Sequence, residues 1–161
     1  MRLFISYSTG DLEIVDQIAD ALRPHADVFY WDKDKEPGED SWQTIFGWID
    51  AADLVIAVIT DRTVSRAMSV GNEIGHARAR RKKIIPLVSS EVPESELGCL
   101  KGVTYRRISR ENIGEMIPKI AALVRKLKQK KEAQDRFLLT ILGILGLIAL
   151  FSGGDEDEDD F

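Results

Sequence analysis

A glutamate follows a fully apolar strand pattern in the middle of the chain. Residues 54–60 are apolar up to a final threonine and mostly β-branched, which predicts a central strand buried on both faces. Residues 64–80 then have helical spacing and place Glu73 one turn from the apolar Val70 and Ala77. Ligands of open α/β sheets bind at the carboxyl edge of the strands. Glu73 is therefore the first acid that we expect to take part in chemistry.

The residues alone leave the role of Glu73 open. A helical glutamate is most often solvated and paired with a basic neighbour, here Arg66 or Arg80, and the residues alone favour this interpretation. Glu73 and His76 lie three positions apart, but a single such pair is usually a surface contact, so we predict no metal site. The glycines on either side of Glu73 do not form a dinucleotide fingerprint, and no phosphate-binding Gly-Lys-Ser/Thr loop is present.

Polar residues also end the first predicted strand. Residues 2–8 predict this strand, which closes with polar side chains at Tyr7 and Ser8, and Thr9 leads into a helix that Pro24 ends. The carboxyl ends of parallel strands meet at one edge of a sheet, so these polar residues are expected at the same edge as Glu73.

The remaining pattern alternates strands with helices. Residues 27–31 predict a second short strand, and residues 32–40 have no apolar side chain and predict an exposed loop. Helices are expected at 41–52 and from 113 onwards, and strands at 83–88 and 103–105. Pro86 suggests that the strand at 83–88 has an irregular or edge position. This alternation predicts an α/β fold with a doubly wound parallel sheet of about five strands.

Composition excludes some classes of protein. Six consecutive acids occupy residues 155–160, and without them the chain has 22 basic and 21 acidic residues. A nearly neutral body argues against nucleic-acid binding, which needs clustered basic residues. The lone Cys99 cannot form an internal disulfide and fits a reducing compartment. The first apolar run is too short for a signal peptide.

The last part of the chain predicts a membrane anchor. Basic residues accumulate up to Arg136, and residues 137–151 are apolar except for Thr140. As a helix they span about 22 Å, or about 27 Å with 152–154 included, against about 30 Å for a bilayer core. We interpret 131–136 as a basic juxtamembrane linker, 137–154 as a C-terminal hydrophobic transmembrane helix and 155–161 as an acidic tail, with the folded domain, 1–130, in the cytoplasm. The alternative is a buried helix or an oligomer seam.

Five motifs in order resemble those of a TIR (Toll/interleukin-1 receptor) domain of the microbial type, over residues 1–130. They are Leu3 to Ser8 followed by Asp11, the acidic loop with Pro37 and Gly38, Ile45 to Ile49 before Asp53, the strand Leu54 to Ile59, and Glu73 with Ile74. The resemblance implies a flavodoxin-like fold. It also implies an NAD+-cleaving enzyme or an assembly module in innate, antiviral defence.

By this resemblance Glu73 matches the catalytic glutamate of the family. Cleavage of the bond between nicotinamide and ribose needs no strong nucleophile, because nicotinamide leaves as a neutral base and the ribose develops oxocarbenium character. One carboxylate can hold the ribose hydroxyls and stabilise the positive charge. NAD+ is then the substrate, and no further cofactor is implied.

The resemblance implies substrate contacts for several other residues. Tyr7, Ser8 and Thr9 are expected to line the nucleotide pocket, although Tyr7 fits a core position equally well. Trp31 and Asp32 are expected to close over the ligand, the alternatives being simple packing for Trp31 and a turn cap for Asp32.

Two further positions are compared with the family. Ser69 lies four residues before Glu73, where many enzymatic relatives carry Trp, so a stacking surface is absent there or supplied by Trp31 or Trp42. Pro37 and Gly38 belong to a loop that bridges neighbouring TIR domains.

Two functions follow from the resemblance. The first is an NAD+ nucleosidase, either an NAD glycohydrolase or an ADP-ribosyl cyclase, in a defence or signalling pathway. The second is a non-catalytic adaptor that acts by TIR–TIR assembly. Expected partners are NAD+, other TIR domains through self-association and, through the C-terminal helix, a membrane; no nucleic acid is expected.

Overall fold

Five parallel strands form one sheet in the computed structural model, which describes residues 1–31, 41–61, 67–109 and 111–152. At residues 9, 67–68 and 143–152 the description covers the backbone alone. The strand order is β2-β1-β3-β4-β5. The strands are β1 (Arg2–Ser6), β2 (Asp27–Phe29), β3 (Leu54–Ile59), β4 (Lys83–Ser89) and β5 (Arg106–Ile108). The predicted α/β class, parallel pairing and strand number are confirmed.

Strand β3 lies at the centre of the sheet. It pairs with β1 on one side and with β4 on the other, so that Ile56 is the Cα partner of both Ile5 and Ile85. All six residues of β3 are buried. The unbroken apolar run therefore corresponds to a strand that is covered on both faces, as its sequence predicts.

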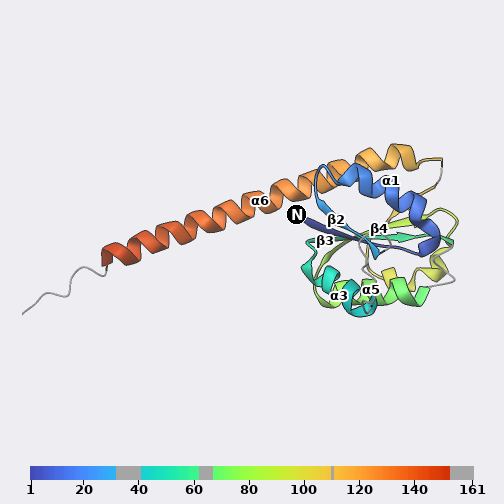
Figure 1. Ribbon diagram of the computed structural model, residues 1–161, viewed down its shortest axis with the longest axis horizontal. Coiled ribbons are helices and arrows are strands. Elements are labelled where there is room, and N and C mark those ends of the chain that lie inside the picture. Colours follow the sequence, from blue (N-terminus) through green and yellow to red (C-terminus); the bar gives the residue numbers. More distant parts are fainter. Residues whose placement is uncertain (32–40, 62–66, 110, 153–161) are drawn as a thin grey trace, which may run out of the picture. The chain divides into compact units, whose positions relative to one another are not determined.

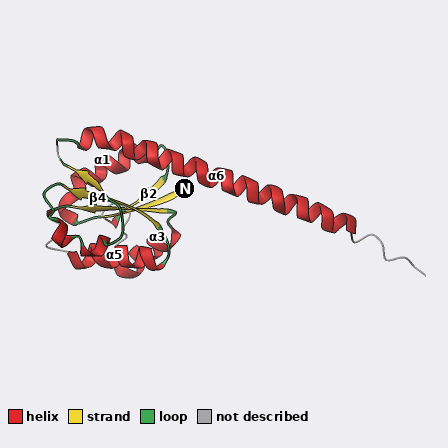
Figure 2. Cartoon of the chain, turned by 180° about the vertical axis from the view of Figure 1, so that it is seen from behind, coloured by secondary structure: helices red, strands yellow, loops and turns green. Residues whose placement is uncertain are grey.

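Helices cover both faces of this sheet (Figures 1 and 2). In the compact unit Met1–Val124, α1 and the first part of α6 lie on one face, and α3 and α5 lie on the other. The helices are α1 (Leu12–Leu22), α3 (Ser41–Ala51), α5 (Ala67–Ala79) and α6 (Ile113–Ser152), and short 3-10 turns occupy Thr9–Asp11, Glu94–Glu96 and Gly98–Leu100. This layering is the doubly wound arrangement expected for alternating strands and helices.

The last strand lies three residues later than the sequence predicts. Residues 103–105 precede the strand, and β5 occupies Arg106–Ile108. Arg107 fits into it because its guanidinium donates hydrogen bonds to the carbonyls of Ser89, at 2.8 Å, and Val92, at 2.6 Å. A charged side chain is tolerated in a strand when its donors are paired in this way.

Pro86 lies on a strand inside the sheet, at a point where that strand is paired on one side only. It is the Cα partner of Ala57 on β3, and β4 has a neighbouring strand on each side. Pairing with β5 begins only at Leu87, beyond the proline. Pro86, which has no N–H to donate, therefore lies before the part of β4 that pairs with β5.

The residues from Arg125 onwards form a second compact unit. Here α6 continues to Ser152, and large apolar side chains are exposed at Phe137, Leu138, Leu139, Ile141 and Leu142. Among the described residues, no helix has both the length and the apolar character needed to cross a membrane. The predicted transmembrane helix at 137–154 and the membrane location are therefore wrong, in keeping with an apolar run shorter than the roughly 20 residues that a bilayer requires. The predicted acidic tail lies outside the described residues.

A buried hydrogen bond ties the start of α1 to the end of β3. The Thr60 hydroxyl donates to Oδ2 of Asp11 at 2.7 Å, and both residues are at most 5% exposed. The carboxylate of Asp11 thus has a tertiary partner at the end of the central strand.

Replacing Thr60 by Val should lower the free energy of unfolding by about 2 kcal/mol, because a hydrogen bond to a buried carboxylate is lost while the side-chain shape is kept. Urea denaturation at pH 7 measures the change. Thr60→Ser is the matched control, because it keeps the hydroxyl and should lose less stability. Equal losses in the two variants would mean that the methyl group, and not the hydrogen bond, stabilises this site.

Candidate active site

Helix α5 brings Glu73 against the carboxyl end of β1. The apolar stripe of the helix, which includes Val70 and Ala77, is buried, and Glu73 lies on the same side with only 6% of its surface exposed. Phe4 of β1 belongs to the same buried cluster as Ala77. Alternate residues of a strand share a face, so Ser6, two residues after Phe4, also lies on the α5 side.

The environment of Glu73 is apolar. Burial raises the pKa of its carboxyl from 4.5 to about 7, and the Ser6 hydroxyl offsets part of this rise. The two groups are neighbours without full hydrogen-bond geometry, and Ser6 Oγ is a buried atom with no partner among the described residues. A carboxyl with a pKa near 7 changes charge in the neutral range, as acids and bases in catalysis commonly do.

Basic side chains on α5 and just after its end bind another acid. Arg80 Nε lies 3.0 Å from Oδ1 of Asp50, and His76 Nε2 lies 2.8 Å from the same oxygen. The Asp50–His76 hydrogen bond is the main cause that lowers the pKa of Asp50. The ion pair between Glu73 and Arg80 considered from sequence is therefore replaced by Asp50–Arg80, and Arg66 lies outside the described residues. In the part of the chain that is described, no cluster of three or more metal-binding side chains occurs.

Aromatic side chains pack beside this face of the sheet. The Trp48 ring contacts Phe4, Phe29 and Trp31, with ring centroids 6.2, 6.5 and 6.0 Å apart. Trp31 is half-buried against the cluster that contains Ala77 of α5. The structure thus gives Trp31 a packing role on the same face as Glu73.

The residues after β1 divide between the two faces. The Tyr7 ring meets that of Tyr30 edge to face, with centroids 6.0 Å apart, and the Tyr30 hydroxyl donates to Asp16 of α1. Tyr7 therefore turns towards α1, on the face opposite to Glu73. Ser8 is buried and its carbonyl accepts the Asp11 N–H at 2.8 Å. Thr9 begins the 3-10 turn.

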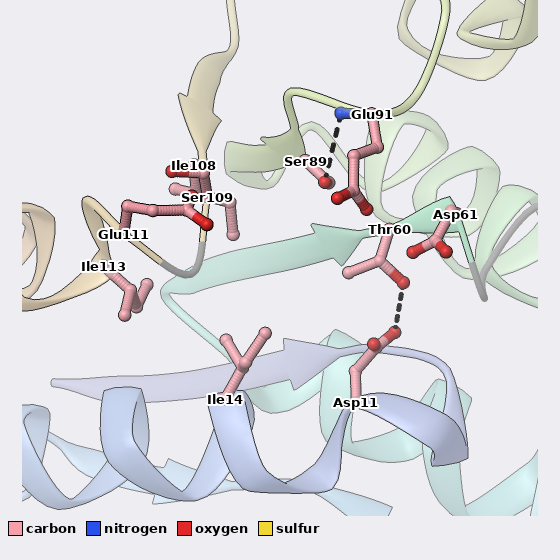
Figure 3. Close-up of a pocket in the computed structure, with 10 residues that line it drawn as sticks. All are labelled: Asp11, Ile14, Thr60, Asp61, Ser89, Glu91, Ile108, Ser109, Glu111 and Ile113. Carbon is pink, nitrogen blue, oxygen red and sulfur yellow. Dashed lines mark hydrogen bonds between the residues drawn. The ribbon is translucent and has the colours of Figure 1, made fainter.

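A pocket of about 290 Å³ opens on the α1 side at the carboxyl edge of the sheet (Figure 3). It lies at the ends of β3, β4 and β5. Its lining residues are Asp11, Ile14, Thr60, Asp61, Ser89, Glu91, Ile108, Ser109, Glu111 and Ile113. Four of these ten carry a carboxylate and none is basic, so the two faces of the edge offer different chemistry.

A family model for the TIR domain matches residues 3–124 of the sequence. The chain belongs to the TIR domain family. The matched residues lie in the unit Met1–Val124, which contains the whole sheet. No curated protein matches the sequence.

Solved structures with the same fold include receptor and enzyme domains. The TIR domain of the Toll-related receptor TRR-2 from Hydra magnipapillata has a TM-score of 0.60 at 19% identity and covers 76% of this chain and 97% of that one. The CMP N-glycosidase BcmB from Clostridium botulinum has a TM-score of 0.55 at 19% identity and covers 76% and 99%. The RPS4 and RRS1 TIR domain heterodimer has a TM-score of 0.59 at 14% identity and covers 78% and 96%. At these identities the likeness concerns the fold alone.

The TIR domain brings some of the predicted site residues together. Glu73 and Trp31 lie on the α5 face, and Ser69 is half-buried one turn before Glu73 on the same helix. The predicted contacts of Asp32 and the predicted assembly loop at Pro37 and Gly38 lie outside the described residues. Sequence reasoning missed Ser6, although its even spacing from Phe4 is a signal for its position below α5.

Glu73→Gln should stabilise the TIR domain above neutral pH. A carboxyl whose folded pKa is raised contributes stability that is complete below about pH 4.5 and is lost as the pH rises through about 7. An uncharged glutamine removes this loss, which amounts to at most about 3 kcal/mol.

Urea denaturation at pH 5 and pH 8 measures the effect. The stability gain should be present at pH 8 and small at pH 5. The control is Glu115→Gln, at an exposed glutamate on α6, which should change little at either pH. A gain of equal size at the two pH values would contradict the burial of a charge at Glu73.

Proposed function

We propose that this TIR domain is an NAD+ nucleosidase, an NAD glycohydrolase or ADP-ribosyl cyclase, that acts in a defence or signalling pathway with Glu73 as its catalytic residue. The observation that carries the proposal is the burial of this carboxylate on α5 beside the carboxyl end of β1. Ligand sites of doubly wound sheets occur at this edge.

The chemistry requires a negative charge close to the ribose. As the bond from C1′ to the nicotinamide nitrogen breaks, its electron pair leaves with nicotinamide, and the ribose becomes positively charged. A carboxylate that is already fixed in an apolar site stabilises this charge more strongly than one in water. Water or a group of the same nucleotide then adds to C1′, which gives the linear or the cyclic product.

The comparison with known structures supports a reaction of this class. One structure with the same fold is named a CMP N-glycosidase, and it covers 76% of the chain. An N-glycosidase cleaves a bond between a sugar and a nitrogen, which is also the bond type that joins ribose to nicotinamide. The family resemblance of Glu73 to a catalytic glutamate points to NAD+ as the nucleotide.

Glu73→Gln should lower the rate of NAD+ cleavage by at least about a hundredfold, the scale of losing one preorganised electrostatic group. Release of nicotinamide from millimolar NAD+ measures both the linear and the cyclic reaction. The matched control is Glu91→Gln in the pocket on the opposite face, which should keep wild-type activity. If Glu91→Gln lost NAD+ cleavage and Glu73→Gln kept it, the reaction would take place in the pocket on the opposite face.

The rate of NAD+ cleavage should rise with pH through about 7 and level off above it. The ionised form of Glu73 is the one that stabilises the ribose cation, and the pKa of its carboxyl is about 7. Turnover measured at saturating NAD+ from pH 5 to pH 9 gives this profile. If the rate falls as the pH rises through 7, Glu73 acts as a proton donor and not as a charge stabiliser.

A TIR adaptor is the second candidate function. It is supported by the solved TIR domain heterodimer of RPS4 and RRS1, whose fold this chain shares. Under this alternative the chain associates with other TIR domains, and Glu73→Gln leaves signalling intact. A signalling assay with the glutamine variant therefore separates the two functions, because an enzyme loses its output and an adaptor keeps it.

A further inference from the structure

The hydroxyl of Ser6 is an unexplained polar group in the core. Its oxygen is the buried side-chain atom without a hydrogen-bond partner among the described residues, and Ser6 is 1% exposed. Buried polar atoms are paired in the great majority of cases, so an orphan calls for a reason. A hydroxyl can rotate and donate to any acceptor that comes within reach.

The acceptor that faces Ser6 is the carboxyl of Glu73. Ser6 is the last residue of β1, and its Cα partner on β3 is Ala57, which offers no polar side chain. The charged groups of the neighbouring elements are engaged with one another, since His76 of α5 and Arg80, which follows α5, both bind Asp50 of α3. Of the described side chains, the Ser6 hydroxyl is the one that acts on the Glu73 carboxyl.

We propose that Ser6 is a positioning residue that donates a hydrogen bond to Glu73 when this carboxyl ionises. Ser6 Oγ has no partner among the described residues, and the carboxylate is a stronger acceptor than the neutral acid, so ionisation draws the hydroxyl onto one of the carboxylate oxygens. The released proton goes to water. Ionisation of Glu73 thus gives the Ser6 hydroxyl a hydrogen-bond partner, and this hydrogen bond stabilises the buried charge.

The link between Ser6 and Glu73 favours a negative charge at the place where the proposed reaction needs one, beside the ribose. The nicotinamide ring of NAD+ carries a positive charge, and a cation near Glu73 favours the ionised carboxyl. The Ser6 hydroxyl then fixes the orientation of the carboxylate beside the ribose. The catalytic part of this inference rests on the proposed function, whereas the link between Ser6 and Glu73 does not.

Titration of the full chain tests the link without any substrate. The side-chain carboxyl carbon of Glu73 is followed by NMR from pH 4 to pH 10 and is assigned with Glu73→Gln. Ser6→Ala should raise the midpoint by about one pH unit, since a donor to the charged form is lost. Ser6→Thr, which keeps the hydroxyl, should restore a midpoint near that of the wild type. Ser89→Ala, at another buried serine that ends β4, should leave the midpoint unchanged.

Activity provides the second readout. The acid limb of the pH profile of kcat should move upwards in Ser6→Ala by the same amount as the NMR midpoint, and the plateau at high pH should lie below that of the wild type, because the ionised carboxylate is no longer held in one orientation. If Ser6→Ala does not fold, Ser6→Cys keeps the volume with a weaker donor and should shift the midpoint in the same direction. An unchanged Glu73 midpoint in a folded variant without the hydroxyl overturns the inference. If Glu73→Gln still cleaves NAD+ while the midpoint moves as expected, the proposed function fails and the link stands.

Discussion

The two-sided burial of strand β3 is the constraint on which the rest of the domain depends. A strand with six buried residues needs cover on both faces, so the chain must place helices alternately above and below the sheet. The consequence at the carboxyl edge is two separate environments. On one side α5 brings Glu73 into an apolar setting, and on the other side α1 and the first part of α6 belong to a face whose pocket has four carboxylates and no basic residue.

The same packing explains why Glu73 is chemically unusual. The helix that must bury Val70 and Ala77 against the sheet carries Glu73 on the same side, and the nearby His76 and Arg80 bind Asp50. The carboxyl is left without a compensating cation among the described residues, so its charged form is disfavoured. A group that costs stability at neutral pH in this way is typical of a functional site, where stability and activity oppose each other.

The sequence predicts much of the fold, because the strands and helices have clear periodicity, and TIR membership follows from motif order. It fails where tertiary contacts override the local pattern. Arg107 enters β5 because two carbonyls accept hydrogen bonds from its guanidinium. The apolar run after Arg136 predicts a membrane segment, but no described helix is long and apolar enough to be one. At the site, the position of Glu73 follows from the pattern. Its burial does not, because only the fold shows that Arg80 binds Asp50 instead.

A carboxyl that titrates near neutral pH can act in two ways on a glycosidic bond, as a proton donor or as a negative charge. A nucleobase that leaves as a poor anion needs a proton, which the neutral acid can supply, whereas nicotinamide leaves as a neutral molecule and benefits from the carboxylate. The TIR scaffold itself does not decide between them, because a fold hosts many chemistries and the site selects one. In the proposed reaction the choice falls to the immediate surroundings of Glu73. Burial alone favours the neutral acid, and the Ser6 hydroxyl at the end of β1 shifts the balance towards the charged form that cleavage of NAD+ requires.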